Sequence, residues 1–157
     1  MNITFIGGGN MASALISGLL QQGYAAEQLR VVEINAESRE KIKHTLGVSA
    51  VAELADGVKG SDVILLAVKP QQLFELTQKL APLLNNQLII SIAAGIRVTD
   101  IIRWLGGYAR VVRAMPNTPS LGRSGVAGLY AAPGVGEVDK KDAEWIRAAV
   151  GPTLCVD

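Results

Sequence analysis

Ile3-Thr4-Phe5-Ile6 runs directly into Gly7-Gly8-Gly9-Asn10-Met11-Ala12 at the start of the 157-residue sequence. The short apolar run predicts a strand, the glycines allow a tight turn, and residues 14–20 predict the helix that follows. This strand–turn–helix is typical of a dinucleotide-binding unit in its G-x-G-x-x-A form. Gly7 makes the turn, Gly9 lets the backbone approach a pyrophosphate, and Ala12 lets helix and strand pack closely.

An acidic residue at the right distance supports this interpretation. Glu33 ends the next apolar run, Leu29-Arg30-Val31-Val32, and lies 21 residues after Ala12. A carboxylate about 20 residues beyond the glycine motif accepts hydrogen bonds from the adenosine ribose hydroxyls in such folds. Spacing and position together favour nucleotide binding over a glycine turn that serves only the fold.

Composition and charge exclude several classes of protein. The length predicts one domain, residues 1–157, with a proper core. A net charge of +1 gives no basic surface for nucleic acid or for an anionic membrane. No apolar run reaches the about 18 residues of a membrane span. Cys155 is the single cysteine, so we expect neither an internal disulfide nor a cysteine-based metal site. We therefore expect the protein to be cytoplasmic.

Strand and helix patterns alternate along the whole chain. This predicts an α/β protein of the Rossmann type, a doubly wound and mostly parallel sheet with helices on both faces. Thr99 or Asp100 is expected to cap a short helix that runs to Trp104. The other predicted helices are residues 36–46, 71–84 and 138–150. The further predicted strands are residues 63–68, 87–92, 110–115 and 153–156, with residues 125–130 paired beside 110–115.

Four unusual segments follow predicted strands, and the carboxyl ends of parallel strands meet at one edge of a sheet. They are Gly7-Gly8-Gly9, Val68-Lys69-Pro70, Ala93-Ala94-Gly95 and Pro116-Asn117-Thr118-Pro119. Open α/β sheets bind ligands at this edge, so we expect the site there. Two interpretations of Lys69 have equal weight: either it contacts the ribose or a phosphate of a cofactor, or it is a solvated lysine. The small residues 93–95 leave room for a flat nicotinamide ring, or simply pack closely.

The segment between the two prolines is the more specific signal. Pro116 and Pro119 fix the backbone twice within four residues, which holds Asn117 and Thr118 as polar groups at a strand end. His44, the only histidine, lies in a charged helix and is expected at the surface. No nucleophile–base pair, carboxylate pair or metal cluster is evident, so we assign no catalytic residue. That pattern fits hydride transfer, in which a cofactor carries the chemistry.

With these residues assembled, the chain resembles the N-terminal domain of pyrroline-5-carboxylate reductases. Residues 5–12, 67–70, 91–95 and 113–119 carry the resemblance. It implies reduction of 1-pyrroline-5-carboxylate to L-proline, the last step of proline biosynthesis, with hydride from NADPH or NADH. It also implies where the cofactor lies. The implied cofactor residues are Gly7, Gly9, Asn10, Met11 and Ala12 at the pyrophosphate, and Ala67, Val68, Lys69, Pro70, Ala93, Ala94 and Gly95 towards the nicotinamide, with Asn117 and Thr118 beside the small imine substrate.

The sequence departs from the family pattern in its ribose region. Members that favour NADPH carry small polar residues and an arginine after the second strand, whereas Glu33 would repel a 2′-phosphate. Asn35 and Arg39 follow closely, and Arg39 would offset part of this repulsion. We therefore expect NADH at least to be tolerated.

The second departure is in length. The family has a further helical domain that forms the dimer and much of the substrate pocket, and this domain is absent here. We expect a fragment that binds cofactor but turns over poorly alone, from a protein that forms a homo-oligomer through the absent domain. The alternatives are a stand-alone dinucleotide-binding or redox-sensing module, and a reductase of another imine or hydroxyacid.

Overall fold

The computed structural model describes residues 1–93, 95–116, 130–131 and 154–155. Ala94, Asn117, Thr118 and the predicted helix 138–150 therefore lie outside the described residues. The strands are β1 (Ile3–Ile6), β2 (Leu29–Val32), β3 (Ser49–Val51), β4 (Val63–Leu66), β5 (Leu88–Ser91), β6 (Val111–Arg113), β7 (Met115–Pro116), β8 (Tyr130–Ala131) and β9 (Leu154–Cys155). The helices are α1 (Asn10–Gln21), α2 (Ala36–Leu46), α3 (Leu54–Val58), α4 (Pro70–Leu80) and α5 (Val98–Trp104), with short 3₁₀ turns at Ala26–Gln28 and Ala81–Leu83.

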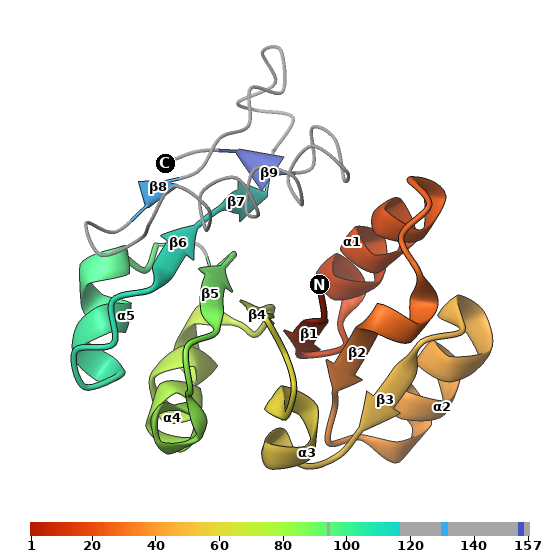
Figure 1. Ribbon diagram of the computed structural model, residues 1–157, viewed down its shortest axis with the longest axis horizontal. Coiled ribbons are helices and arrows are strands. Elements are labelled where there is room, and N and C mark those ends of the chain that lie inside the picture. The colour runs from red at the N-terminus through yellow and green to blue at the C-terminus, as the bar shows by residue number, and fades with distance from the viewer. Residues whose placement is uncertain (94, 117–129, 132–153, 156–157) are drawn as a thin grey trace.

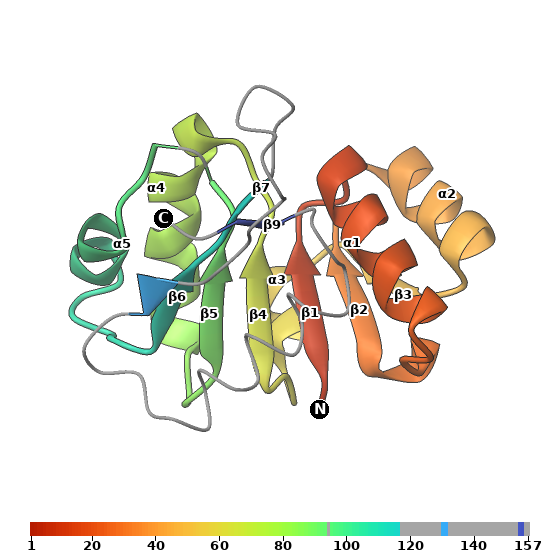
Figure 2. The ribbon, with the colours of Figure 1, turned by 90° about the horizontal axis from the view of Figure 1, so that it is seen from above.

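The strands form a sheet in the order β3-β2-β1-β4-β5-β6-β8. Strands β1 to β6 are parallel, and β8 is antiparallel to β6. Figure 2 shows these parallel strands side by side, pointing the same way. Helices α1 and α2 cover one face of the sheet, and α3, α4 and α5 cover the other (Figure 1). The doubly wound, mostly parallel sheet predicted from the sequence is confirmed, and its chain order reverses between β1 and β4.

The central strands are buried because helices cover them on both sides. Every residue of β1, β4 and β5 is buried. Two of these buried residues are polar, Thr4 and Ser91. The Thr4 hydroxyl in β1 donates to the carbonyl of Gly57 in α3 at 2.7 Å and lies against the Ser61 hydroxyl. These bonds satisfy a buried polar group at the amino ends of the strands, away from the edge where ligands are expected.

The structure differs from the sequence predictions at short elements and helix ends. Strand β3 and helix α3 were not predicted, since three and five residues are too few to show a periodic pattern. Helix α4 ends at Leu80 rather than at residue 84, because Pro82 has no N–H to continue it. The predicted cap of α5 is wrong: Arg97 is the N-cap, its side chain makes no capping hydrogen bond, and Thr99 and Asp100 lie inside the helix.

Two predictions about the later strands are partly tested. Tyr130 pairs with Arg113 through β8, as expected of the end of the predicted segment 125–130. The predicted strand 153–156 appears as β9, which pairs with β7 in a separate two-stranded sheet rather than extending the main sheet. Within the described ranges, no helix is long and apolar enough to cross a membrane.

Candidate functional site

A cleft of about 810 Å³ opens at the carboxyl ends of β1, β2, β4 and β5, where the chain order of the sheet reverses. Its size is that of a small-molecule or cofactor site, and its position is the one at which open α/β sheets bind ligands. The sheet edge and α1 contribute Ile6, Gly7, Gly8, Gly9, Asn10, Met11, Val32, Glu33, Ile34, Ile92 and Ala93. The opposite wall contributes Ala52, Glu53, Leu54, Ala67, Val68, Lys69, Pro70, Gln72, Glu75, Leu76 and Lys79.

Gly7 is a glycine because the protein itself requires one there. Its φ is +101°, a conformation that other residues rarely adopt, and an added Cβ would lie 2.7 Å from the carbonyl oxygen of Ala67. Its N–H donates to the carbonyl of Val32 at 2.9 Å, which joins the turn to β2. The turn is therefore fixed against the ends of both neighbouring strands.

Gly9 has a different reason to be a glycine. Its φ is −76°, which any residue adopts, and an added Cβ would meet no described atom within 4 Å. Gly9 lines the cleft, so the missing side chain leaves the backbone open to a ligand. This is the role expected of the second glycine of a dinucleotide motif, beside the pyrophosphate.

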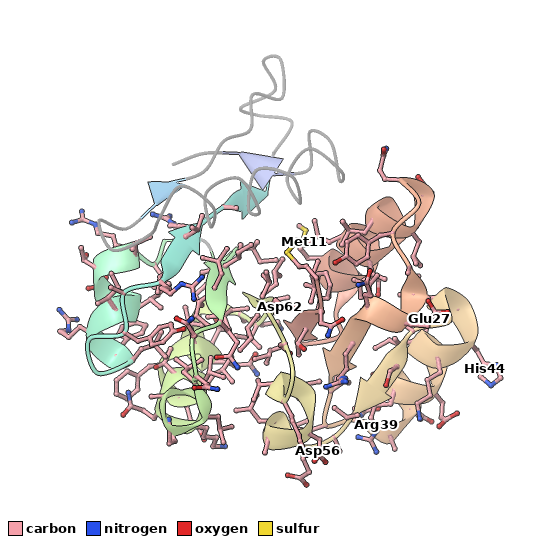
Figure 3. All side chains as sticks on the ribbon, in the orientation of Figure 1. Met11, Glu27, Arg39, His44, Asp56 and Asp62 are labelled. Carbon is pink, nitrogen blue, oxygen red and sulfur yellow. The ribbon has the colours of Figure 1, made fainter. Side chains whose placement is uncertain are left out.

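The start of α1 faces the same cleft. Asn10 and Met11 begin the helix and line the cleft, and Figure 3 shows the Met11 side chain pointing from α1 towards the end of β5. The N-cap residue, Gly9, has no side chain to cap this helix, and no acidic residue lies in its first turn. The first N–H groups of a helix have no partner within it, and together with the helix dipole they attract an anion. A phosphate group fits this end of α1.

Glu33 lies half-buried at the end of β2 and is held at both carboxylate oxygens. One oxygen accepts the N–H of Gly8 at 3.1 Å, and the other accepts the N–H of Asn35 at 3.0 Å. A carboxylate has about four acceptor positions, so hydroxyl donors in the cleft still find an acceptor. The carboxylate predicted to receive the ribose hydroxyls is thus at the cleft and tied to the glycine loop.

Asn35 and Arg39 do not line the cleft, and both stabilise the turn after β2. The Asn35 side chain accepts the N–H of Ser38 at 2.9 Å and so caps α2. Nη1 of Arg39 donates to the carbonyl oxygens of Glu33 and Ile34, at 2.8 and 2.9 Å. The sequence could not show these contacts, because they depend on the path of the turn.

Replacing Asn35 by alanine is expected to lower the free energy of unfolding by about 1 kcal/mol, the usual value of an N-cap bond. Aspartate at the same position supplies an equivalent oxygen and is expected to retain the stability. Urea unfolding of the two variants measures this difference. An equal loss in both variants would contradict the capping role.

The segment after β4 forms the opposite wall. The N–H of Ala67 donates to the carbonyl of Ile6 at 2.9 Å, which holds this wall against the end of β1. Lys69 is exposed at the N-cap of α4, and its N–H donates to the Gln72 side chain at 3.4 Å. Pro70 is the first residue of α4, where a proline is best tolerated. The Lys69 ammonium is therefore carried on a fixed backbone at the rim of the cleft.

The cleft brings together most of the residues predicted for the site. Ala93 lines it and is 3% exposed. Ala12 and Gly95 do not line it: Ala12 is buried against the core, and Gly95 takes a φ of +77° after β5. His44 is exposed on α2 and points away from the sheet, as predicted (Figure 3). Among the described residues, no group of three or more His, Cys, Asp or Glu side chains is placed to hold a metal ion.

Sequence reasoning missed part of the opposite wall of the cleft and the most exposed apolar residue among those that line it. Ile34 follows Glu33 directly and is 85% exposed, an unusual state for isoleucine. Leu54 and Leu76 lie on the same cleft from α3 and α4. An apolar residue directly after the acidic one was the available signal for Ile34. No motif marks the other two, because they reach the cleft only through the packing of their helices.

Comparison with known proteins agrees with this geometry. Residues 2–95 match the family described as NADP oxidoreductase, coenzyme F420-dependent. Over 99% of its length the chain is 46% identical to a pyrroline-5-carboxylate reductase of Pseudomonas aeruginosa, and it covers 57% of that protein.

Solved structures show the same likeness. A pyrroline-5-carboxylate reductase of Coxiella burnetii is 40% identical with a TM-score of 0.87, over 99% of this chain and 57% of that one. A pyrroline carboxylate reductase of Plasmodium falciparum, with NADP bound, has a TM-score of 0.81 at 24% identity, over all of this chain and 56% of that one. At that identity the second likeness supports the fold alone. The chain thus spans a little more than half the length of the relatives it matches.

Proposed function

The chain belongs to the NADP oxidoreductase, coenzyme F420-dependent family, and on that premise we propose that residues 1–157 are the cofactor-binding domain of a pyrroline-5-carboxylate reductase. One observation supports this proposal most directly: the glycine loop and the uncapped start of α1 line the same cleft, whose volume suits a cofactor. The 46% identity to the Pseudomonas aeruginosa reductase over almost the whole chain supports the choice of reaction. The resemblance read from the sequence and the comparisons therefore point to the same relatives.

The described residues fit a nicotinamide dinucleotide in a defined order along the cleft. Ile34 offers an apolar surface to adenine, and Glu33 offers acceptors to the adenosine ribose. The uncapped start of α1 and the open backbone at Gly9 receive the pyrophosphate. The end of β5 at Ala93 borders the remaining part of the cleft, which leaves the nicotinamide at that end.

In this proposal the protein orients the cofactor and the substrate, and the cofactor supplies the reacting group. A reduced nicotinamide, when bound, supplies the hydride that reduces the carbon–nitrogen double bond of the substrate. Hydrogen bonds within the protein fix the turn at Gly7 and the strand ends at Ala67 and Ala93, and these residues would hold the nicotinamide ring. Lys69 at the rim adds a positive charge beside the ribose and phosphates. No described side chain is assigned a proton-transfer step.

Glu33 sets the expected preference between the two cofactors. Its carboxylate lies in the cleft at the ribose position, and like charge opposes a 2′-phosphate there. We propose that NADH is accepted at least as well as NADPH, within a family whose description names NADP.

The remaining roles follow from the resemblance alone. We propose that Asn117 and Thr118 lie beside a small imine substrate, and that Ala94 and Gly95 border the nicotinamide. We also propose a cytoplasmic protein that assembles as a homo-oligomer through the part of its relatives that this chain does not span.

The test is an assay of nicotinamide oxidation with pyrroline-5-carboxylate, run on this chain and on a longer relative such as the Pseudomonas aeruginosa enzyme. We expect the chain to bind NADH and NADPH, with turnover far below that of the longer enzyme. A chimaera that joins this chain to the remainder of the relative is expected to restore turnover. A chimaera that binds cofactor but reduces no pyrroline-5-carboxylate would contradict the proposed reaction and favour another imine or hydroxyacid. A chain that binds no dinucleotide would overturn the proposal as a whole.

A further inference from the structure

The turn between β2 and α2 is fixed by polar contacts from both of its sides. On the inner side, the Glu33 carboxylate accepts backbone N–H groups from Gly8 and Asn35. On the outer side, Nη1 of Arg39 donates to the backbone carbonyls of Glu33 and Ile34. The residue that presents its carboxylate to the cleft is therefore held at its side chain and at its backbone.

The direction of Arg39 matters because an arginine near this turn is the expected receptor of a 2′-phosphate. Here the side chain is half-buried and does not line the cleft. Its Nη1 group spans two adjacent carbonyls at 2.8 and 2.9 Å, both good hydrogen-bond distances. Turning the guanidinium towards a phosphate in the cleft would leave both carbonyls without this donor.

We propose that Arg39 is a positioning residue: it holds the Glu33 turn in the geometry that accepts a ribose diol, and it does not receive a 2′-phosphate. The proposal rests on the proposed function, since it concerns the same cofactor. It corrects the sequence-based expectation that Arg39 offsets the repulsion of NADPH by Glu33. In this role Arg39 favours NADH over NADPH, because it keeps the repelling carboxylate in place.

The Glu33 carboxylate also links two parts of the cofactor site. The same group that faces the ribose position accepts the N–H of Gly8, within the loop that receives the pyrophosphate. An added Cβ at Gly8 would lie 3.0 Å from this carboxylate and 2.6 Å from Cδ1 of Ile42, so loop and turn are in close contact. A turn loosened by loss of Arg39 therefore weakens the diol contacts first and disturbs the loop second.

The two roles of Arg39 predict changes of opposite sign in cofactor preference. Dissociation constants for NADH and NADPH are measured by titration of the 157-residue protein, as wild type and as Arg39→Met. Methionine keeps the apolar stem and removes the charge and the donors. We expect Arg39→Met to weaken NADH about tenfold, the effect of losing one hydrogen bond to a charged group, and to change NADPH by less than about threefold.

Lys41→Met is the matched control. Lys41 is an exposed residue of the same helix, and its substitution removes one positive charge without touching the turn. We expect it to leave the ratio of the two dissociation constants unchanged. Arg39→Lys keeps a charge and N–H donors but loses the planar guanidinium, so it is expected to retain only part of the NADH affinity.

Selective loss of NADPH binding in Arg39→Met would overturn the proposal, since it would make Arg39 a phosphate receptor. Equal weakening of both cofactors would also overturn it, because a merely structural role moves both. If Arg39→Met does not fold, the wild type still decides: tighter binding of NADPH than of NADH contradicts the proposal. Failure of the wild type to bind either dinucleotide overturns the proposed function itself, which separates the two outcomes.

Discussion

Gly9→Val is expected to remove dinucleotide binding while leaving the protein folded. Gly9 has an ordinary φ of −76°, and a Cβ there meets no described atom, so the protein accommodates a side chain at this position. The added atoms would instead occupy the place proposed for the pyrophosphate at the start of α1. We expect affinity for NADH to fall at least about 100-fold, since several charge-assisted hydrogen bonds are lost together.

Two measurements separate binding from folding in this variant. Titration with NADH gives the affinity, and thermal unfolding gives the stability. The free energy of unfolding is expected to change by less than about 1 kcal/mol, the value of a preferred N-cap residue. A Gly9→Val protein that binds NADH as the wild type does would show that the pyrophosphate lies elsewhere.

Gly7→Ala is expected to destabilise the protein strongly, by about 3 kcal/mol. The left-handed conformation costs an alanine about 1–2 kcal/mol, and forcing atoms into a packed region costs about 1–3 kcal/mol. The new Cβ would lie 2.7 Å from the Ala67 carbonyl, which belongs to the backbone at the end of a buried strand and does not yield easily. Thermal unfolding is expected to show a midpoint lower by roughly 10 °C.

Gly23→Ala is the control for this result. Gly23 has a similar φ of +92°, but an added Cβ there meets no described atom within 4 Å. Its substitution carries the conformational cost alone, about 1–2 kcal/mol. The difference between the two variants measures the contact with Ala67. Equal losses would mean that the wall of the cleft moves freely, against the geometry of the turn.

The fold was predictable where burial imposes a strong pattern. The bounds of β1, β2 and α2 agree with the sequence prediction, since the two strands appear as short apolar runs and the helix as a charged segment. The pair β3 and α3 left no such signal. The cap of α5 was wrong because polar residues near a helix start suggest a cap, whereas the backbone path decides which residue occupies it.

The site was predictable from residues whose identity the chemistry restricts. The spacing of Gly7, Gly9 and Glu33 predicted that these residues meet at one site, and all three line the same cleft. The direction of the Arg39 side chain was not predictable. Whether a charged residue near a turn contacts a ligand or a backbone carbonyl depends on the backbone path of the few residues that form the turn. The predictions for Asn117 and Thr118 lie outside the described residues and stay predictions.

The central claim is that the cleft at the carboxyl ends of β1 and β4 binds a nicotinamide dinucleotide with its pyrophosphate at the start of α1. Amide chemical shifts of the ¹⁵N-labelled 157-residue protein, followed as NADH is added, test it residue by residue. The largest saturable shifts are expected at Gly9, Asn10 and Met11, with further shifts at Glu33 and Lys69 and none at Gly47. Absence of shifts at the start of α1, or saturable shifts confined to another surface, would contradict the account.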